Sequence, residues 1–175
     1  MRSISQLIDH TLTLVQPKWT KSSFELRFGD EMIAEITFPK AMSLRARITT
    51  AEGSWFLWRE GFFKQRLLAI REGETDNAAS GTADGWKGTT EIIFKNGKKY
   101  IIKPNVWKSL TEIRKETGEV MVTLRKEGTF HPTTKITMNR TASVTPDLPL
   151  LVLFGIYAVI LQMRDSHALI VAVGI

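Results

Sequence analysis

The chain is dominated by short segments in which apolar and polar residues alternate. Two of them, residues 24–28 (FELRF) and 32–38 (MIAEITF), flank the turn residues Gly29-Asp30. A period of two is typical of a β-strand with one buried face, and a break that contains glycine is typical of a hairpin. The sequence therefore predicts a hairpin here, with Met32, Ala34 and Ile36 on the buried face and Ile33 on the other.

The same pattern recurs as far as residue 138. Predicted strands lie around residues 44–49, 55–58, 92–94, 100–102, 110–114, 120–124 and 136–138. Asn96-Gly97 is the strongest turn signal, because both residues adopt positive φ readily. The intervals are too short for βαβ crossovers. About ten short strands at this spacing predict a mainly β fold, an antiparallel sandwich or barrel.

Two segments depart from this pattern. Residues 72–88 (EGETDNAASGTADGWKG) are polar and rich in glycine, which favours a long loop, with a short strand inside it as an alternative. Residues 148–161 (LPLLVLFGIYAVIL) are apolar on every side of a helix, with Asp147 as the predicted N-cap and Arg164 near the predicted end. A helix without a polar face must be buried all round, in protein or in lipid.

The length of this apolar segment favours protein. Its fourteen residues would extend for about 21 Å, whereas crossing a bilayer takes roughly 20 apolar residues. If residues 148–175 were embedded instead, Arg164 and Asp165 would lie at membrane depth, which is costly. We therefore expect a helix enclosed by the strands, with Ala168–Ile175 as an added edge strand or a tail. A C-terminally membrane-anchored protein, with residues 148–175 in the bilayer, is the alternative.

A run of hairpins that ends in the segment PDLPLLVLFGIYAVILQMRD resembles the tubby C-terminal-like superfamily, which includes LURP-one-related proteins and phospholipid scramblases. The resemblance covers roughly residues 24–164 and is nearest to the LURP-one-related type. It implies a single domain over residues 1–175: a closed antiparallel β-barrel of about twelve strands around a buried hydrophobic C-terminal helix. Scramblases carry an acidic segment before this helix. Here Asp147 is the only carboxylate in MNRTASVTPDLP, so we do not expect calcium-triggered scrambling.

The positive charge is concentrated in one part of the chain. The net charge is +6, and residues 95–140, with 11 basic and 4 acidic residues, have a net charge of +7. If loops at one end of the barrel gather these charges, they form an anion-binding surface. The candidate residues for binding anionic lipid headgroups are Lys95, Lys98, Lys99, Lys103, Lys108, Arg125 and Lys126. The alternative is a solubilising surface whose lysines protect strand edges from pairing.

Trp86 and Trp107 are candidate membrane anchors beside these charges, because tryptophan is enriched at membrane interfaces. Placement in the core is the reading we favour for both. The expected partners are an anionic phospholipid surface, bound peripherally, or a protein. Basic and aromatic residues do not interleave as in nucleic-acid-binding modules, so we do not expect nucleic acid as a partner.

No motif indicates catalysis. The chain has no cysteine, no G-x-S-x-G elbow, no phosphate-binding glycine loop and no histidine pair with metal-ligand spacing. Glu72, Glu74, Asp76 and Asp84 have the ligand type for a hard cation, but a solvated loop is the favoured reading. We therefore expect a non-enzymatic domain without cofactor or metal. The absence of cysteine and of an apolar N-terminal leader indicates the cytoplasm, with peripheral attachment to a membrane. A helix that fills the barrel leaves no lumen for a ligand.

Overall fold

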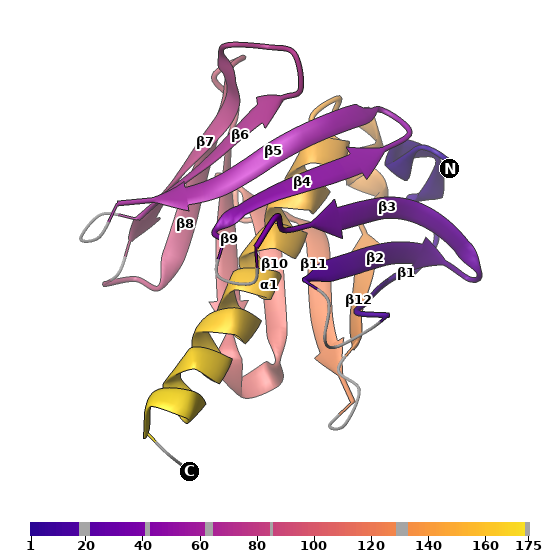
Figure 1. Ribbon diagram of the computed structural model, residues 1–175. Coiled ribbons are helices and arrows are strands. Elements are labelled where there is room, and N and C mark those ends of the chain that lie inside the picture. Colours follow the sequence, from indigo (N-terminus) through magenta and orange to yellow (C-terminus); the bar gives the residue numbers. More distant parts are fainter. Residues whose placement is uncertain (18–21, 41–42, 62–64, 85, 129–132, 174–175) are drawn as a thin grey trace.

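The computed structural model describes residues 1–17, 22–40, 43–61, 65–84, 86–128 and 133–173 (Figure 1). Twelve strands precede one long helix. The strands are β1 (Leu12–Val15), β2 (Ser23–Phe28), β3 (Glu31–Thr37), β4 (Arg45–Thr50), β5 (Gly53–Glu60), β6 (Arg66–Arg71), β7 (Asn77–Asp84), β8 (Thr89–Phe94), β9 (Lys99–Asn105), β10 (Leu110–Lys115), β11 (Val120–Glu127) and β12 (Thr133–Met138). The helices are α1 (Leu148–Val173) and the short 3₁₀ turns η1 (Ile4–Leu7), η2 (Val106–Lys108) and η3 (Arg140–Val144).

The strands form a closed antiparallel barrel. Each strand pairs with the one before it in the chain, and β12 pairs with β1 to close the sheet, with Leu14 opposite Thr134. Closure leaves no unpaired edge. The predicted fold, a closed antiparallel barrel of about twelve strands around a buried C-terminal helix, is confirmed.

The barrel interior is filled by alternate residues of each strand. One layer runs across five neighbouring strands through Ala46, Leu57, Ala69, Ala79 and Phe94, each paired with the next. All five side chains are buried. Three of these five residues are alanines, and small inward residues are how a barrel makes room for what it encloses.

The helix α1 is enclosed by this sheet (Figure 1). From Leu150 to Tyr157 every residue is buried, and Leu148 and Leu161 are buried as well. Asp147 occupies the predicted N-cap position, since its carbonyl accepts the Leu151 N–H at 2.9 Å. Its carboxylate, however, accepts hydrogen bonds from the Asn96 amide nitrogen at 3.2 and 2.9 Å. This contact connects the start of the helix to the β8–β9 hairpin.

The helix does not end near Arg164, and the prediction of an edge strand or tail for Ala168–Ile175 is wrong as far as Val173; residues 174 and 175 lie outside the described part. α1 has 26 residues and is about 39 Å long. It continues because its charged residues find partners at the barrel rim. Arg164 donates to the Ser43 carbonyl at 2.7 Å, and Asp165 accepts two hydrogen bonds from Arg59, at 2.7 and 3.1 Å.

Two predictions about the strands also need correction. Eight of the seventeen residues 72–88, predicted as a long loop, form the strand β7, which was the stated alternative; its inward positions include the small residues Ala79 and Gly81. In β3, Met32 is half-buried and Ile33 is fully buried, the reverse of the predicted alternation. A bulge causes the reversal: Leu26 pairs with Ala34 and Arg27 with Met32, so Ile33 is an extra residue that turns inward.

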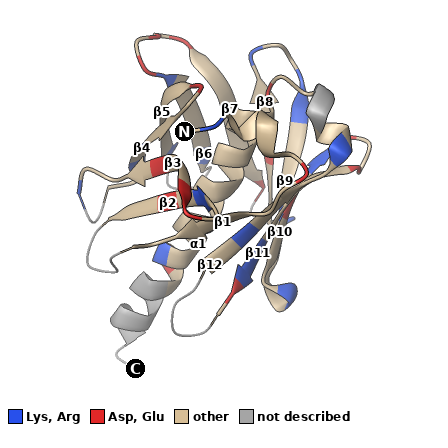
Figure 2. Cartoon of the chain, turned by 90° about the vertical axis from the view of Figure 1, so that its right-hand side faces the viewer, with Lys and Arg blue, Asp and Glu red and all other residues tan. Residues whose placement is uncertain are grey.

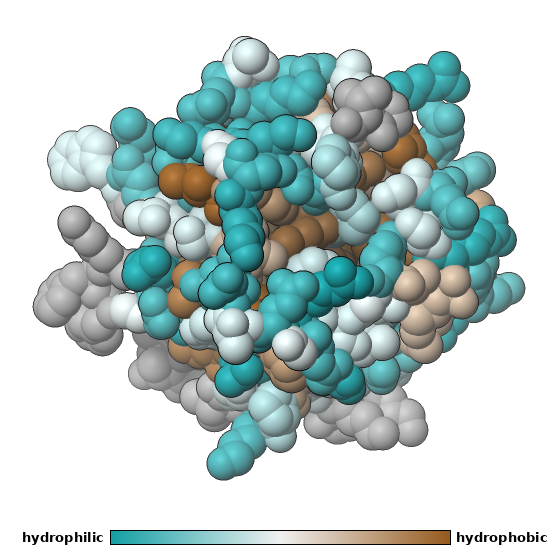
Figure 3. All heavy atoms as spheres, turned by 90° about the horizontal axis from the view of Figure 1, so that it is seen from above, coloured by the Kyte–Doolittle hydropathy of each residue, from teal (hydrophilic) through white to brown (hydrophobic). Residues whose placement is uncertain are grey.

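The barrel has two chemically different ends. At the end where α1 begins, called the helix-start end, lie η1, the β8–β9 turn and the β10–β11 turn. Seen from this side, the surface is mostly hydrophilic with apolar atoms at its centre (Figure 3). Ile4 and Leu7 of η1 are buried there. At the opposite end, the helix-exit end, α1 leaves the barrel and extends past the ends of β9 and β10 (Figure 1).

Candidate functional site

The structure does not gather the seven predicted basic residues at one end. Turns of an antiparallel barrel alternate between its two ends, so residues in successive turns are separated by the length of a strand. Lys95, Lys98 and Lys99 flank the β8–β9 turn at the helix-start end, whereas Lys108 lies in η2 at the helix-exit end. Figure 2 shows basic residues distributed along the barrel. The expectation of a single basic end is therefore wrong.

The three lysines at the helix-start end lie beside acidic residues. Lys95 contacts Asp76 at 3.2 Å, Lys98 lies 4.0 Å from Asp147, and Lys99 lies 4.0 Å from Glu116. Paired charges attract a distant anion weakly, because the field of each lysine is offset by its neighbour. These three positions are the weaker part of the predicted anion-binding set.

The remaining four lie on the outer wall and at the helix-exit end. Lys103 lines a shallow depression on the outside of β8–β10 that also contains Glu91 and Glu116. Lys108, Arg125 and Lys126 are exposed and make no ion pair within the described part of the chain. Lys126 and Ser109 are joined by a backbone hydrogen bond of 2.9 Å, so the ends of β11 and η2 lie side by side.

Trp86 and Trp107 are exposed, which overturns the preference for a core position. Trp86 is 97% exposed and Trp107 is 99% exposed. Both lie in connections at the helix-exit end, β7–β8 and β9–β10, and Val106 beside Trp107 is 85% exposed. A tryptophan buries 150–250 Å² when it packs, so two that touch almost nothing of their own chain leave a large apolar area uncovered.

Both tryptophan loops are held by side-chain caps. The Asp84 carboxylate accepts the backbone N–H groups of Trp86 and Lys87 at 3.0 and 3.1 Å. The Asn105 side chain accepts the Lys108 N–H at 3.2 Å, and Ser109 completes the turn with a φ of 48°. Such local hydrogen bonds define the loop backbone. The tryptophans are thus presented outward by ordered turns.

One side of α1 is fastened where it leaves the barrel. The Tyr157 hydroxyl donates to the Leu44 carbonyl, and Arg164 lies 3.9 Å from the centre of the Phe38 ring. Burial raises the pKa of Tyr157 above its usual value and lowers the pKa of Arg164. The hydrogen bonds that Arg59 donates to Asp165 raise the pKa of Arg59. These contacts fix the helix against the β3–β5 side of the rim.

On the other side of α1 a pocket of about 400 Å³ opens at the same end. Its walls are α1 from Val159 to Ser166 and the rims of β9–β12. The helix fills the interior of the barrel, as expected. At the rim, however, there is space for a ligand, which was not expected. The helix-exit end thus combines exposed tryptophans, unpaired cations and a pocket.

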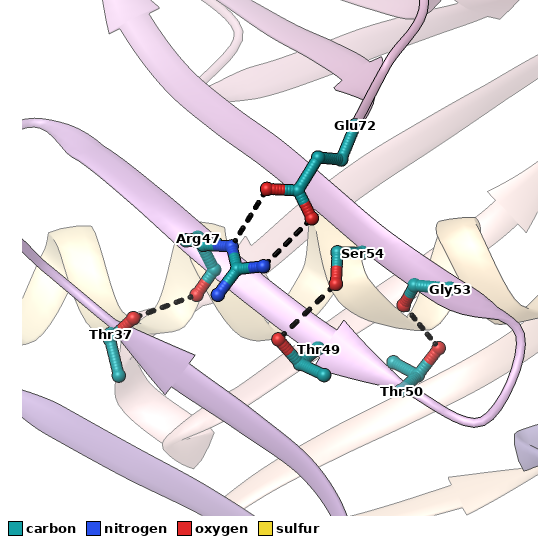
Figure 4. Close-up of polar contacts among 7 residues, drawn as sticks. All are labelled: Thr37, Arg47, Thr49, Thr50, Gly53, Ser54 and Glu72. Atoms are coloured by element: carbon teal, nitrogen blue, oxygen red, sulfur yellow. Dashed lines mark hydrogen bonds and ion pairs between the residues drawn. The ribbon is translucent and has the colours of Figure 1, made fainter.

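The four acidic residues weighed as cation ligands do not come together. Glu72 forms two hydrogen bonds with Arg47 on the outer face of β4, at 3.1 and 2.8 Å (Figure 4). Arg47 thereby lowers the pKa of Glu72 below its usual value. Asp76 contacts Lys95, and Asp84 lies at the opposite end of the barrel. Among the described residues no group of three or more metal-ligating side chains is found.

The helix passes the length and composition criteria for a membrane span, but the structure places it in protein. Residues 148–166 are long and apolar enough, yet 72% of that window is buried inside the barrel. Side chains that line the core cannot face lipid at the same time. For Leu148–Leu161 the membrane-embedded alternative is therefore not supported, because these residues are buried in the barrel. The argument from length does not hold, since the complete helix has 26 residues and is longer than predicted.

Comparisons with known proteins identify the fold. No protein-family model matches the sequence, and no curated protein does. An X-ray structure of a protein from Arabidopsis thaliana is similar, with a TM-score of 0.54 and 11% sequence identity. The similarity covers 83% of this chain and 90% of that one. It is therefore a likeness of whole folds, and the chain is a β-barrel domain with an enclosed C-terminal helix.

Proposed function

We propose that the protein binds anionic membrane surfaces peripherally, with the helix-exit end of the barrel facing the lipid. The observation that carries this proposal is the near-complete exposure of Trp86 and Trp107 on two ordered loops at that end. Tryptophan is favoured at the headgroup level of a bilayer, where its ring is partly apolar and its N–H remains wet.

Charge at the same end supports an anionic surface. Lys108, Arg125 and Lys126 are exposed there, and the acidic residues nearby include Glu127 and Asp165, of which Asp165 is paired with Arg59. Each lysine or arginine near an anionic bilayer contributes about 1 kcal/mol. In addition, residues 168–173 of α1 (ALIVAV) are all apolar in sequence, and α1 extends beyond the strands at this end (Figure 1). The alternative is that the tryptophans bind a protein partner. The exposed basic residues at the same end favour anionic lipid.

The fold also supports a family assignment as part of this proposal. The chain is a member of the tubby C-terminal-like superfamily, of the LURP-one-related type, and acts as a non-enzymatic binding domain. Support comes from twelve strands closed around a hydrophobic C-terminal helix and from the similarity to the Arabidopsis structure. A cytoplasmic location stays a prediction from the absence of cysteine.

Vesicle sedimentation tests the role of the tryptophans. Wild-type protein is expected to sediment with vesicles of phosphatidylcholine and phosphatidylserine and to stay in solution with phosphatidylcholine alone. Replacing Trp86→Ser and Trp107→Ser together is expected to weaken binding at least tenfold, because both anchors are lost. Ile93→Ser is the control: this residue is 38% exposed on β8, and its loss should change binding less than twofold.

Matched charge variants test which end faces the lipid. Lys108→Gln with Arg125→Gln is expected to reduce binding roughly thirtyfold, since two cations contribute about 2 kcal/mol. Lys95→Gln with Lys98→Gln removes the same charge from the helix-start end and should change binding less than threefold. Equal effects of the two pairs would contradict the proposed orientation. Wild-type protein that binds no vesicle would contradict lipid binding altogether and favour a protein partner.

A further inference from the structure

Two threonine side chains of the sheet line the pocket at the helix-exit end. Thr111 of β10 is 4% exposed and Thr134 of β12 is 3% exposed, and both lie on the inward face of the sheet. Neither side chain makes a hydrogen bond within the described part of the chain. Neither hydroxyl oxygen is among the fully buried polar atoms without a partner, so both reach the space of the pocket. Two threonine hydroxyls in the wall of one pocket are therefore available to a polar group of a ligand.

Six of the other twelve lining residues are apolar, and six are polar or charged. Leu124 of β11 and Val159 of α1 are 1% and 6% exposed, and both line the pocket together with Met163 and Leu110. Its volume, about 400 Å³, lies in the range of small-molecule sites, which are typically about 300–1,000 Å³. A ligand that fills this space therefore meets hydrocarbon on one part of the lining and polar groups on the other.

The charge of the lining is positive at the rim. Lys126 and Asp165 are the two charged residues of the lining. Asp165 is bound by Arg59, and its charge is therefore compensated, whereas Lys126 makes no ion pair within the described ranges. Thr134 lies directly opposite Lys126 in the sheet, and Thr111 lies opposite Leu124 one layer deeper. A cation and a hydroxyl thus lie together at the mouth, above an apolar floor.

We infer that this pocket binds a single-chain anionic amphiphile, with its carboxylate or phosphate head at Lys126 and Thr134 and its alkyl chain along Leu124, Val159 and Met163. A cation beside hydroxyl donors recognises an oxyanion, and the apolar floor recognises hydrocarbon. The inference deepens the proposed function by naming a ligand class at the same end of the barrel. Its residues differ from the tryptophans and from the Lys108–Arg125 pair, so the two proposals are tested separately.

Titration with short amphiphiles below their micelle concentrations tests the inference without vesicles. The probes are decanoate, decyl phosphate, decanol and decyltrimethylammonium, with ¹⁵N chemical shifts as the readout. We expect decanoate or decyl phosphate, or both, to bind at least tenfold more tightly than the ammonium compound. The shift changes should centre on residues 109–111, 124–126 and 159–166. Preference for decanoate indicates a fatty acid as the natural source, and preference for decyl phosphate indicates a lysophospholipid.

Three substitutions separate a binding site from a structural feature. Gln162→Trp places a large ring at the exposed rim of the pocket and is expected to abolish binding of every probe. Lys126→Met should weaken the anionic probes at least tenfold while leaving decanol unchanged, and Lys98→Met at the other end is its matched control. Thr111→Val should weaken binding about threefold while leaving the melting temperature of the ligand-free protein nearly unchanged, because a hydroxyl that meets solvent in the pocket adds little to stability.

The outcomes distinguish this inference from the proposed membrane binding. Gln162→Trp should still sediment with anionic vesicles, and the Trp86→Ser, Trp107→Ser double variant should still bind decanoate or decyl phosphate. Failure of all four probes to shift the residues of the pocket would overturn the inference and leave the vesicle result standing. Equal affinity for the anionic and cationic probes would also overturn it, because Lys126 would then have no role.

Discussion

Replacing Ile156 with aspartate is expected to unfold the entire barrel. Ile156 has no exposed surface, and the segment Leu148–Leu161 that surrounds it contains no charged residue. Truncating a buried isoleucine costs about 2–5 kcal/mol, and a buried carboxylate without a partner adds several more. Because a domain of this kind is typically stable by only about 5–15 kcal/mol, the variant should lose its cooperative thermal transition in circular dichroism.

Two controls give this result its meaning. Ile156→Val removes one methylene and should cost about 0.5–1.5 kcal/mol while the transition stays cooperative. Ile93→Asp makes the same chemical change on the outer face of β8, where the side chain is 38% exposed, and should cost less than about 1 kcal/mol. A soluble Ile156→Asp variant that melts at the wild-type temperature would show that α1 does not lie inside the sheet.

Gly155→Val is expected to destabilise the barrel, because Gly155 lies where α1 comes close to β10 and β11. A Cβ atom at this position would lie 2.8 Å from Cδ1 of Ile113 and 3.0 Å from Cδ1 of Leu124. Both side chains are themselves buried, so the two extra methyl groups of valine have no space nearby. Overpacking of this kind costs about 1–3 kcal/mol, which should appear as a lower midpoint in urea unfolding.

A second-site change checks that the cause is steric. Leu124→Ala alone opens a cavity and should cost about 2–5 kcal/mol. In the double variant Leu124→Ala, Gly155→Val, the free energy of unfolding should fall by at least about 1 kcal/mol less than the sum of the two single decreases, because the valine fills part of the cavity. Gly155→Ala should have a small net effect, since its better helix propensity, about 1 kcal/mol, offsets the displacement of two flexible side-chain ends. Strict additivity of Leu124→Ala and Gly155→Val would contradict the close contact.

The residue pattern was sufficient to predict a mainly β fold, a sandwich or barrel, around a buried helix, and the family resemblance implied the closed barrel. Alternation with period two gave the strands of the first hairpin, and Asn96-Gly97 gave the β8–β9 turn. The absence of any polar face from Leu148 to Leu161 required burial on all sides, and a closed sheet provides it. The strands, the turn and the buried helix were predicted correctly where the signal lies within one segment of the sequence.

The features that were mispredicted depend on other parts of the chain. β7 was not the favoured prediction, because its inward residues Ala79 and Gly81 are small and give no clear alternation of apolar and polar residues. Their small size leaves room for the helix that the barrel encloses. α1 continues past Arg164 and Asp165 because these two residues form hydrogen bonds with Ser43 and Arg59, which are more than 100 residues away in the sequence. No local pattern contains that information.

The candidate site also has features that one segment predicts and features that depend on the whole fold. The sequence identified Trp86, Trp107 and the basic residues as a group, but it assigned them to one end and favoured the core for the tryptophans. The order of hairpins determines which turns share an end, and that order separates Lys95, Lys98 and Lys99 from the remaining basic residues. The position of each tryptophan in a turn, after Asp84 and after Asn105, was the available signal for exposure.

Site-directed spin labelling with vesicles tests most directly the claim that the helix-exit end faces the membrane. The chain has no cysteine, so single labels can be placed at Val106→Cys, at that end, and at Asp30→Cys, in the β2–β3 turn at the other end. With vesicles containing phosphatidylserine, we predict that the label at residue 106 gains oxygen accessibility and is shielded from a water-soluble nickel reagent, while the label at residue 30 stays accessible to that reagent. Shielding at residue 30, or no change at residue 106 in vesicle-bound protein, would contradict this account.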